Sequence, residues 1–348
     1  MRRLCLHIGA DKCGSSSLQG YLSQTPRMVQ RDGRPLRYVL FKPKGIVGPV
    51  QVQKRTSRSP LGYASSAPLQ ELTWTDPPAQ KQVQQFLQRQ EADLISSCEF
   101  WLRELPFRRG IERLRQLLLL LGPVELHLIC AVRPPLEWLN SAWWQWGAWN
   151  NTESFANWID QTLPLTDWDR LLRPVADAFP EATLHVGCSK PDVITTVLKM
   201  ISVQRKDNAP TPRINASLPA AVLRLYQQQP QLRPDPNQCA IDFSALAALS
   251  DSGRTLDPAP WVFDLNTVAS VLARSAAANQ RLLAWLNAEE QARMRTDAAW
   301  WDPAAYSDRS AEDPHRAAIP QLESLCAALL QAFHAQRPQN LREHRGAR

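Results

Sequence analysis

Short apolar runs alternate with helical patterns along the first 200 residues of the chain. The run from Leu4 to Ile8 is bulky and ends at Gly9, which is typical of a buried strand. Ser15 and the two serines after it offer capping hydroxyls, and apolar residues then recur at helical spacing, so a helix is predicted to begin here. This order of strand, loop and helix is the first unit of an alternating α/β pattern.

The same alternation continues toward the C-terminus. Residues 26–80 are the exception, because they are rich in Pro, Gly, Ser and basic residues and are expected to form long loops with short strands at most. Strands joined by helices predict an α/β domain with a parallel sheet, followed by a helical C-terminal half. The predicted strands are 93–97, 125–132 and 182–187, and the predicted helices are 78–90, 108–121, 134–149, a segment ending near 201, and 266–287.

The 348 residues are enough for a large core, and 44% hydrophobic with 21% charged residues is typical of a globular protein. We expect one α/β domain over residues 1–336 and a basic disordered tail over 337–348. There is no apolar run of about 18 residues and no signal-peptide pattern after Met1, so a cytoplasmic protein with no membrane partner is predicted.

Cysteine and charge patterns exclude some classes of function. The seven cysteines form no C-x-x-C pair, so neither a disulfide framework nor a metal site is expected. The net charge is +7, and twelve of the 40 Lys and Arg residues lie in residues 1–60. Such a local excess is consistent with a polyanionic partner, an anionic substrate or a solvated basic loop. No zinc-finger, RRM or helix-turn-helix pattern accompanies it, so nucleic acid is not an expected partner.

The loop from Gly9 to Ser17 is the first candidate site. A strand that runs into a glycine-bounded loop and then a helix directs backbone N–H groups and the positive helix end toward one point, which favours a phosphate or sulfate. Lys12 adds a cation. The pattern is not that of a Walker A loop, because Lys12 precedes Gly14. An ordinary kinase or ATPase is therefore disfavoured, and a plain strand-turn-helix connection is the alternative.

The segment from Leu6 to Gln19 resembles the 5′-phosphosulfate loop of bacterial-type sulfotransferases that use 3′-phosphoadenosine 5′-phosphosulfate (PAPS), typically G-x-x-K-T-G-T-T-S-L-Q. Cys13 replaces the usual Thr, and two serines replace the Thr pair. The resemblance implies a P-loop-like three-layer α/β/α fold and PAPS as the cofactor, with adenosine 3′,5′-bisphosphate as its product. It also implies that the loop binds the donor through Lys12, Gly14, Ser15, Ser16 and Ser17.

A second motif follows the strand predicted at 125–132. Arg133 stands at the carboxyl end of that strand, where open α/β sheets bind ligands, and its guanidinium is suited to grip a phosphate. Arg133 and Ser141 fit R-x-P-x(5)-S, which is similar to the 3′-phosphate motif of the same sulfotransferases, and Gln145 fits its usual continuation. Weaker resemblances to the family are carried by residues 96–99 and 213–218.

The resemblance implies transfer of a sulfuryl group from PAPS to a hydroxyl or amine of a small-molecule or carbohydrate acceptor, without a metal. Lys12 is expected to stabilise charge on the departing phosphate. Glu99 is the favoured general base, with His7 and Asp11 as rivals. A structural ion pair of Glu99 with Arg103 is the alternative. Two other functions stay open: an atypical P-loop phosphotransferase, and a non-catalytic nucleotide- or polyanion-binding protein.

Two further features concern the acceptor. Seven of the 13 tryptophans fall between Trp138 and Trp168, and their near-helical spacing favours core positions over a stacking platform. The stretch from Arg27 to Arg58 holds nine basic residues against Asp32, which is suited to steer an acidic polysaccharide.

Overall fold

The computed structural model describes residues 1–59, 61–72, 74–149, 154–205, 218, 220–229 and 259–315. The chain divides into two compact units. The first comprises Met1–Trp138, Leu163–Ile214 and Ala269–Ala305, and the second comprises Leu139–Thr162, Asn215–Val268 and Tyr306–Arg348. The predicted tail at 337–348 lies outside the described residues, as does nearly all of the 213–218 segment.

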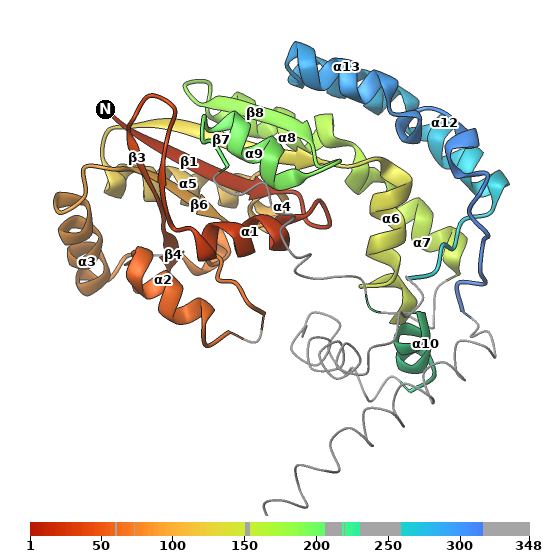
Figure 1. The fold of residues 1–348 in the computed structure, drawn as a ribbon, viewed down its shortest axis with the longest axis horizontal. Helices are drawn as coiled ribbons and strands as arrows, with labels where there is room; N and C mark the ends of the chain where they lie inside the picture. Colours follow the sequence, from red (N-terminus) through yellow and green to blue (C-terminus); the bar gives the residue numbers. More distant parts are fainter. Residues whose placement is uncertain are drawn as a thin grey trace, which may run out of the picture. The chain divides into compact units, whose positions relative to one another are not determined.

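The first unit contains a six-stranded sheet in the order β2-β3-β6-β1-β7-β8 (Figure 1). Its neighbouring strands are parallel except for β2, which pairs antiparallel with β3. The predicted parallel sheet is therefore confirmed. The bounds are β1 (Arg2–Gly9), β2 (Arg27–Val29), β3 (Pro35–Tyr38), β6 (Asp93–Ser97), β7 (Val124–Val132) and β8 (Thr183–Cys188).

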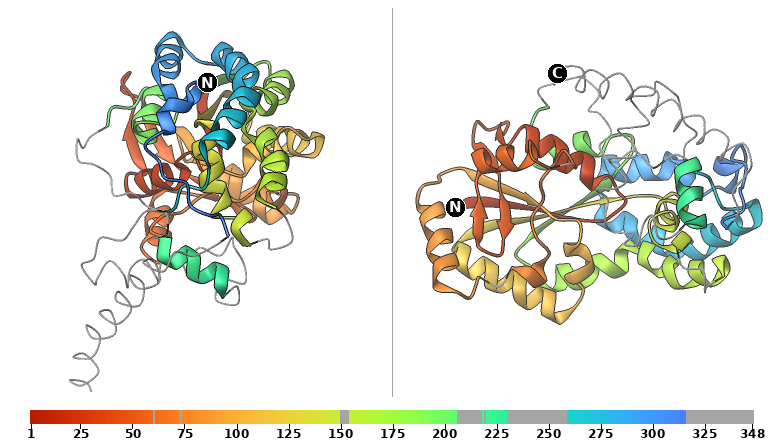
Figure 2. Two further views of the ribbon diagram at one scale, coloured as in Figure 1. Left: turned by 90° about the vertical axis from the view of Figure 1, so that its right-hand side faces the viewer. Right: turned by 90° about the horizontal axis from the view of Figure 1, so that it is seen from below.

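Helices cover both faces of this sheet and give a three-layer α/β/α fold. Helix α1 lies on one face in contact with α9, and α5 lies on the other face, as the view from below shows (Figure 2). The described helices of the first unit include α1 (Ser15–Gln24), α2 (Pro49–Thr56), α3 (Pro77–Gln88), α4 (Trp101–Glu104), α5 (Arg108–Leu121), α8 (Trp168–Ala178), α9 (Val193–Met200) and α13 (Ala288–Thr296). None of the described helices is long and apolar enough to cross a membrane.

The central strands are buried on both faces, which explains their continuous apolar runs. In β1, Leu4, Leu6 and Ile8 are fully buried, and Leu6 stands between Ser96 of β6 and Leu128 of β7. The helices on the faces of the sheet are amphipathic. Helix α5, for example, buries Leu114, Leu117 and Leu121 on one side. This core fixes where each strand ends, and so where each following loop begins.

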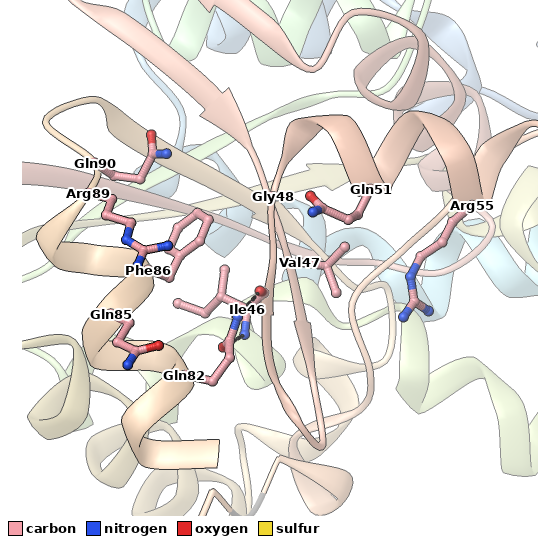
Figure 3. Close-up of a pocket in the computed structure, with 10 residues that line it drawn as sticks. All are labelled: Ile46, Val47, Gly48, Gln51, Arg55, Gln82, Gln85, Phe86, Arg89 and Gln90. Atoms are coloured by element: carbon pink, nitrogen blue, oxygen red, sulfur yellow. Dashed lines mark hydrogen bonds between the residues drawn. The ribbon is translucent and has the colours of Figure 1, made fainter. Parts of the chain in front are cut away.

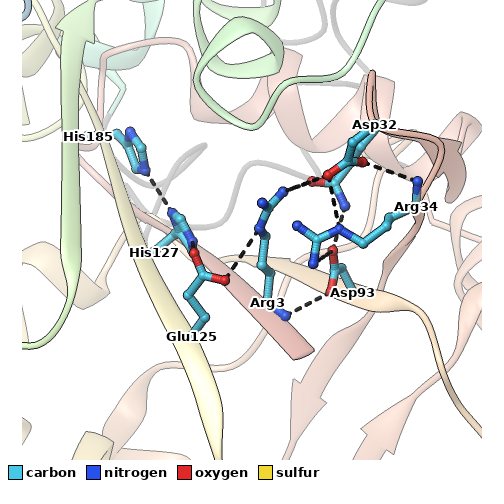
Figure 4. Close-up of polar contacts among 8 residues, drawn as sticks. Arg3, Asp32, Arg34, Asp93, Glu125, His127 and His185 are labelled. Carbon is cyan, nitrogen blue, oxygen red and sulfur yellow. Dashed lines mark hydrogen bonds and ion pairs between the residues drawn. The ribbon is translucent and has the colours of Figure 1, made fainter. Parts of the chain in front are cut away.

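A polar network joins the strands at their amino ends, on the edge opposite the β1–α1 loop (Figure 4). His127 lies 2.9 Å from both His185 and Glu125. Arg3 lies 3.5 Å from Glu125 and 3.3 Å from Asp32. Burial and the neighbouring His127 lower the pKa of His185 to about 4, so this imidazole is neutral at physiological pH. The network ties β1, β7, β8 and the β2–β3 turn together.

Two predicted segments differ from the structure. Residues 26–80 do form short strands, including β4 (Leu40–Lys42) and β5 (Gly45–Val47), but they also form helix α2, whose polar sequence buries only Pro49 and Val52. The helix predicted at 134–149 ends earlier, as α6 (Pro135–Trp143), before a short 3-10 turn at Gly147–Trp149. A Cβ at Gly147 would lie 2.3 Å from the Trp143 ring, so the close packing of this turn requires glycine.

Aromatic packing is the main feature of the described part of the second unit. The Trp143 ring contacts Phe155 and Trp158 of α7 (Phe155–Thr162), with ring centroids 4.8 and 5.1 Å away. Trp144 is buried and donates to the Pro260 carbonyl. Trp138 and Trp168 are buried in the first unit as well, so these tryptophans belong to the core rather than to an exposed stacking platform. The second unit also holds α10 (Ala220–Gln228), and α12 (Leu265–Leu282) belongs to both units.

Candidate active site

The loop between β1 and α1 turns sharply at the carboxyl edge of the sheet. Lys12 and Gly14 both adopt left-handed backbone conformations, with φ of 60° and 91°. The Ser15 hydroxyl donates to the Ala10 carbonyl at 3.1 Å, and the Trp138 indole donates to the Asp11 carbonyl at 2.8 Å. The loop is therefore held by a hydrogen bond from Ser15, at the start of α1, and by one from Trp138 of α6.

Helix α1 begins at Ser15, but none of the three serines caps it. The N-cap is Gly14, with no side-chain capping bond, so the predicted capping by serine hydroxyls is wrong. The reason is that the left-handed turn at Gly14 places the serines inside the first helical turn. The backbone N–H groups in the first turn of α1 have no partner within the helix. Together with the helix dipole they favour an anion in front of α1.

Two glycines allow the loop to approach its neighbours closely. A Cβ added to Gly9, where φ is 121°, would lie 2.6 Å from the Glu99 carbonyl oxygen. A Cβ added to Gly14 would lie 2.8 Å from the Val193 side chain at the start of α9. The loop is thus seated between the end of β6 and the start of α9, and glycine is required at both positions.

Replacing Gly9 with alanine is expected to destabilise the fold by about 2–4 kcal/mol, because both the backbone angle and the contact with Glu99 oppose a side chain. Gly33→Ala is the matched control, since Gly33 has φ of 83° but nothing within 4 Å of an added Cβ. It should cost only about 1–2 kcal/mol. Urea denaturation measures both, and equal losses would show that the contact with Glu99 is unimportant.

The two motifs meet at this loop. Arg133 follows β7, and its guanidinium donates to the Lys12 carbonyl at 3.1 Å across 121 residues of sequence. It also donates to Glu137 of α6 at 3.2 Å, and Glu137 is paired in turn with Lys190, which follows β8. Three cationic residues from separate strand ends, Lys12, Arg133 and Lys190, therefore lie along one edge of the sheet.

Lys190 and Glu137 are site residues that the sequence prediction missed. A signal was present for Lys190, because it comes shortly after the predicted strand at 182–187, at the edge where the other ligand-binding residues were expected. Glu137 lies four residues after Arg133, the spacing of a helical ion pair.

Glu99 lies beside the loop, two residues after the end of β6. The Cys98 N–H donates to the His7 carbonyl at 3.0 Å, which continues the β1–β6 pairing up to Glu99. Burial raises the pKa of the Glu99 carboxyl above its usual range, and the negative charge of Asp11 adds to this, while Lys12 and Arg103 oppose it. A carboxyl with a raised pKa is a stronger base than an ordinary one, which suits a general base.

The rival bases are less suitable. Asp11 is buried and accepts two hydrogen bonds from Arg103, at 3.2 and 2.5 Å, so Asp11 is a structural partner of that guanidinium. His7 is fully buried, with Nδ1 2.8 Å from the Ser97 hydroxyl. Burial lowers its pKa to about 4. Its Nε2 has no hydrogen-bond partner within the described chain, and its complete burial keeps it from a solvent-borne acceptor.

Other predicted residues take varied positions. Ser16 and Ser17 are half-buried, and the Ser16 hydroxyl lies 3.4 Å from the Tyr63 hydroxyl. Cys13 is 1% exposed, and burial raises the pKa of its thiol well above the usual range. Because this side chain is in the core, Cys13 acts in packing, and the exchange of Thr for Cys removes no exposed hydroxyl. Ser141 lies on α6 within the second unit, so its role stays a prediction.

A separate groove of about 430 Å³ lies among α2, β5 and α3 (Figure 3). The Gln82 amide fixes one wall by bonding both backbone groups of Ile46, at 2.7 and 2.8 Å. The other lining residues include Arg55, Arg89 and Phe86, three more glutamines and no carboxylate. Among the residues that the structure describes, no cluster of three or more His, Cys, Asp or Glu side chains is arranged to bind a metal ion.

Comparisons with known proteins add little to the functional assignment of these residues. No family model matches the chain, and no curated protein sequence matches it. Among solved structures, the chain is similar to a sulfotransferase from Alicyclobacillus acidocaldarius, with 13% identity and a TM-score of 0.39 over 85% of this chain and 99% of the other. Identity and TM-score this low establish no shared function, so the functional assignment rests on the site itself.

Proposed function

We propose that the protein is a sulfotransferase that transfers the sulfuryl group of PAPS to an acceptor hydroxyl or amine. The observation that carries the proposal is the contact between Arg133 and the Lys12 carbonyl at 3.1 Å. Two motifs that the sequence separates by more than a hundred residues meet at the carboxyl edge of one parallel sheet. Each resembles the motif for a different phosphate of the same nucleotide, and their meeting supports one ligand bound by both.

The residues of the loop fit the anionic groups of PAPS. Lys12, the first turn of α1 and Arg133 supply cationic and N–H donors, and the left-handed turn at Gly14 starts α1 at this point of the loop. Bound PAPS supplies a sulfuryl group on its 5′-phosphate. Lys12 stabilises the negative charge that grows on this phosphate as transfer proceeds, and Arg133 binds the 3′-phosphate. Glu99 accepts the proton of the acceptor hydroxyl.

The proposal extends to a long anionic carbohydrate as acceptor. The groove at α2 and α3 lies toward the amino end of β1, where Arg2 donates to the Gln90 carbonyl, so it would bind a part of the carbohydrate distant from the reacting hydroxyl. Glutamine amides, an aromatic ring and two guanidinium groups line the groove at α2 and α3. Amides and aromatic rings suit sugar hydroxyls and ring faces, and the guanidinium groups suit carboxylate or sulfate substituents.

If an acidic polysaccharide binds in this groove, Arg55→Ala combined with Arg89→Ala should raise KM for that polysaccharide by about tenfold or more. The double substitution should also reduce the salt dependence of this KM, without changing KM for PAPS. An unchanged KM for every acceptor would contradict this part.

The function is tested by incubating the protein with 35S-labelled PAPS and a panel of neutral and acidic saccharides. Transfer of label to a saccharide, with release of adenosine 3′,5′-bisphosphate, is the expected result. Labelled ATP with Mg²⁺ serves as the parallel donor. Phosphoryl transfer from ATP without any sulfuryl transfer would instead identify an atypical phosphotransferase. Binding of the bisphosphate without transfer to any acceptor would favour a non-catalytic nucleotide-binding protein.

A further inference from the structure

Glu137 joins two cations at the edge of the sheet. Its carboxylate accepts from the Arg133 guanidinium at 3.2 Å through one oxygen and from the Lys190 ammonium through the other. The Glu137 side chain is 3% exposed, whereas Arg133 is 29% and Lys190 is 47% exposed. The carboxylate is thus the buried member of the cluster, and both cations face outward at the end of the strands.

Backbone contacts fix the position of this cluster. The Ser189 N–H donates to the Val132 carbonyl at 2.8 Å, which joins the ends of β8 and β7 just before Lys190 and Arg133. The Trp168 indole donates to the Arg133 carbonyl at 3.2 Å. Lys190 and Arg133 therefore start from adjacent, restrained points of the backbone, and their long side chains converge on one carboxylate.

The electrostatics favour a role in ligand binding. Burial alone would raise the pKa of Glu137, but the hydrogen bond from Lys190 and the charge of Arg133 outweigh it and leave the pKa lowered. Glu137 is therefore ionised and cancels one of the two positive charges, so the cations can lie close together without strong repulsion. Arg133 uses two of its five N–H groups on Glu137 and the Lys12 carbonyl among the described residues, and Lys190 uses one of three. The remaining donors are suited to an anion.

We propose that Lys190 binds the 3′-phosphate of the nucleotide together with Arg133, and that Glu137 is a positioning residue that holds both cations in place for it. The inference rests on the proposed function, since that function supplies the nucleotide. Glu137 holds both side chains in place before the nucleotide binds, which lowers the entropy cost of ordering a Lys and an Arg side chain on binding. A nucleotide that lacks the 3′-phosphate gains nothing from this pair.

The test compares adenosine 3′,5′-bisphosphate with adenosine 5′-phosphate by titration calorimetry. Lys190→Ala is expected to weaken binding of the bisphosphate by about 10- to 100-fold and to leave binding of the 5′-phosphate unchanged. Lys190→Arg keeps the charge and should retain most of the affinity. Lys199→Ala is the matched control, because Lys199 is similarly exposed and also paired with a carboxylate, that of Glu289. It should change neither affinity.

Glu137→Gln tests positioning against simple charge. The substitution adds one positive charge, so charge alone predicts tighter binding of both nucleotides. A positioning role predicts the opposite for the bisphosphate, with weaker binding and an unchanged affinity for the 5′-phosphate. Tighter binding of the bisphosphate would overturn the role of Glu137. Equal losses for both nucleotides in Lys190→Ala, or no loss, would overturn the role of Lys190. If the parent does not prefer the bisphosphate, the proposed function fails first and the inference with it.

Discussion

Replacing Lys12 with alanine is expected to lower kcat by about 100- to 1,000-fold, the typical loss when one preorganised donor to a developing charge is removed. The left-handed backbone at Lys12 and the contact of its carbonyl with Arg133 hold this residue at the centre of the loop. Because the charge on the departing phosphate grows only during transfer, the loss should fall on turnover. The affinity for PAPS should weaken by less than about tenfold.

Rates of label transfer and calorimetric titration with adenosine 3′,5′-bisphosphate separate the two effects. Lys44→Ala is a suitable control, because Lys44 is an exposed lysine in the turn between β4 and β5. It should have normal kcat and normal nucleotide affinity. Full turnover in Lys12→Ala, or a loss confined to nucleotide affinity, would contradict the role of Lys12 in stabilising the leaving phosphate.

Replacing Glu99 with glutamine is expected to lower kcat by about 100- to 10,000-fold, since proton removal from the acceptor would lose its base. The pH profile gives a second readout. A general base must be ionised, and burial raises the pKa of Glu99, so activity of the parent should fall with decreasing pH already above the usual range of a carboxylate. In Glu99→Gln this acid limb should disappear.

Asp11→Asn provides the comparison for Glu99. Asp11 pairs with Arg103, so this variant should lose stability, and it should keep an acid limb that is moved to lower pH, because the charge of Asp11 contributes to the raised pKa of Glu99. Glu112→Gln alters an exposed carboxylate that pairs with Arg108 and should leave both kcat and the pH profile unchanged. If Glu99→Gln kept the pH profile of the parent, another group would have to be the base.

The sequence predicted the sheet well because its central strands carry strong, local signals. The runs that became β1, β6 and β7 are largely buried, so most residues in them are apolar or small. The helix at Arg108–Leu121 was predicted with the bounds that the structure gives, because Gly122 and Pro123 end a strongly amphipathic segment. The motifs at Lys12 and Arg133 were predicted for the same reason, since each directly follows such a strand.

Features that depend on contacts across the sheet were not predictable in this way. Nothing local in the sequence shows that the Ser15 hydroxyl bonds the Ala10 carbonyl or that Cys13 is enclosed in the core. Lys190 becomes a neighbour of Arg133 only through the parallel pairing of β8 with β7. The contact of Glu137 with two cations is seen only once the fold brings Arg133 and Lys190 together. The sequence thus predicts where the strands end, but it does not predict which side chains the strand ends bring together.

In the proposed function, the two motifs form one site for a 3′,5′-bisphosphorylated adenosine nucleotide. It is tested most directly by calorimetric titration of the parent and Arg133→Ala with adenosine 3′,5′-bisphosphate and, separately, with ATP and Mg²⁺. We expect micromolar binding of the bisphosphate to the parent, a large loss of affinity in Arg133→Ala, and poor binding of ATP to both. No binding of the bisphosphate by the parent, or a preference for ATP with Mg²⁺, would contradict it.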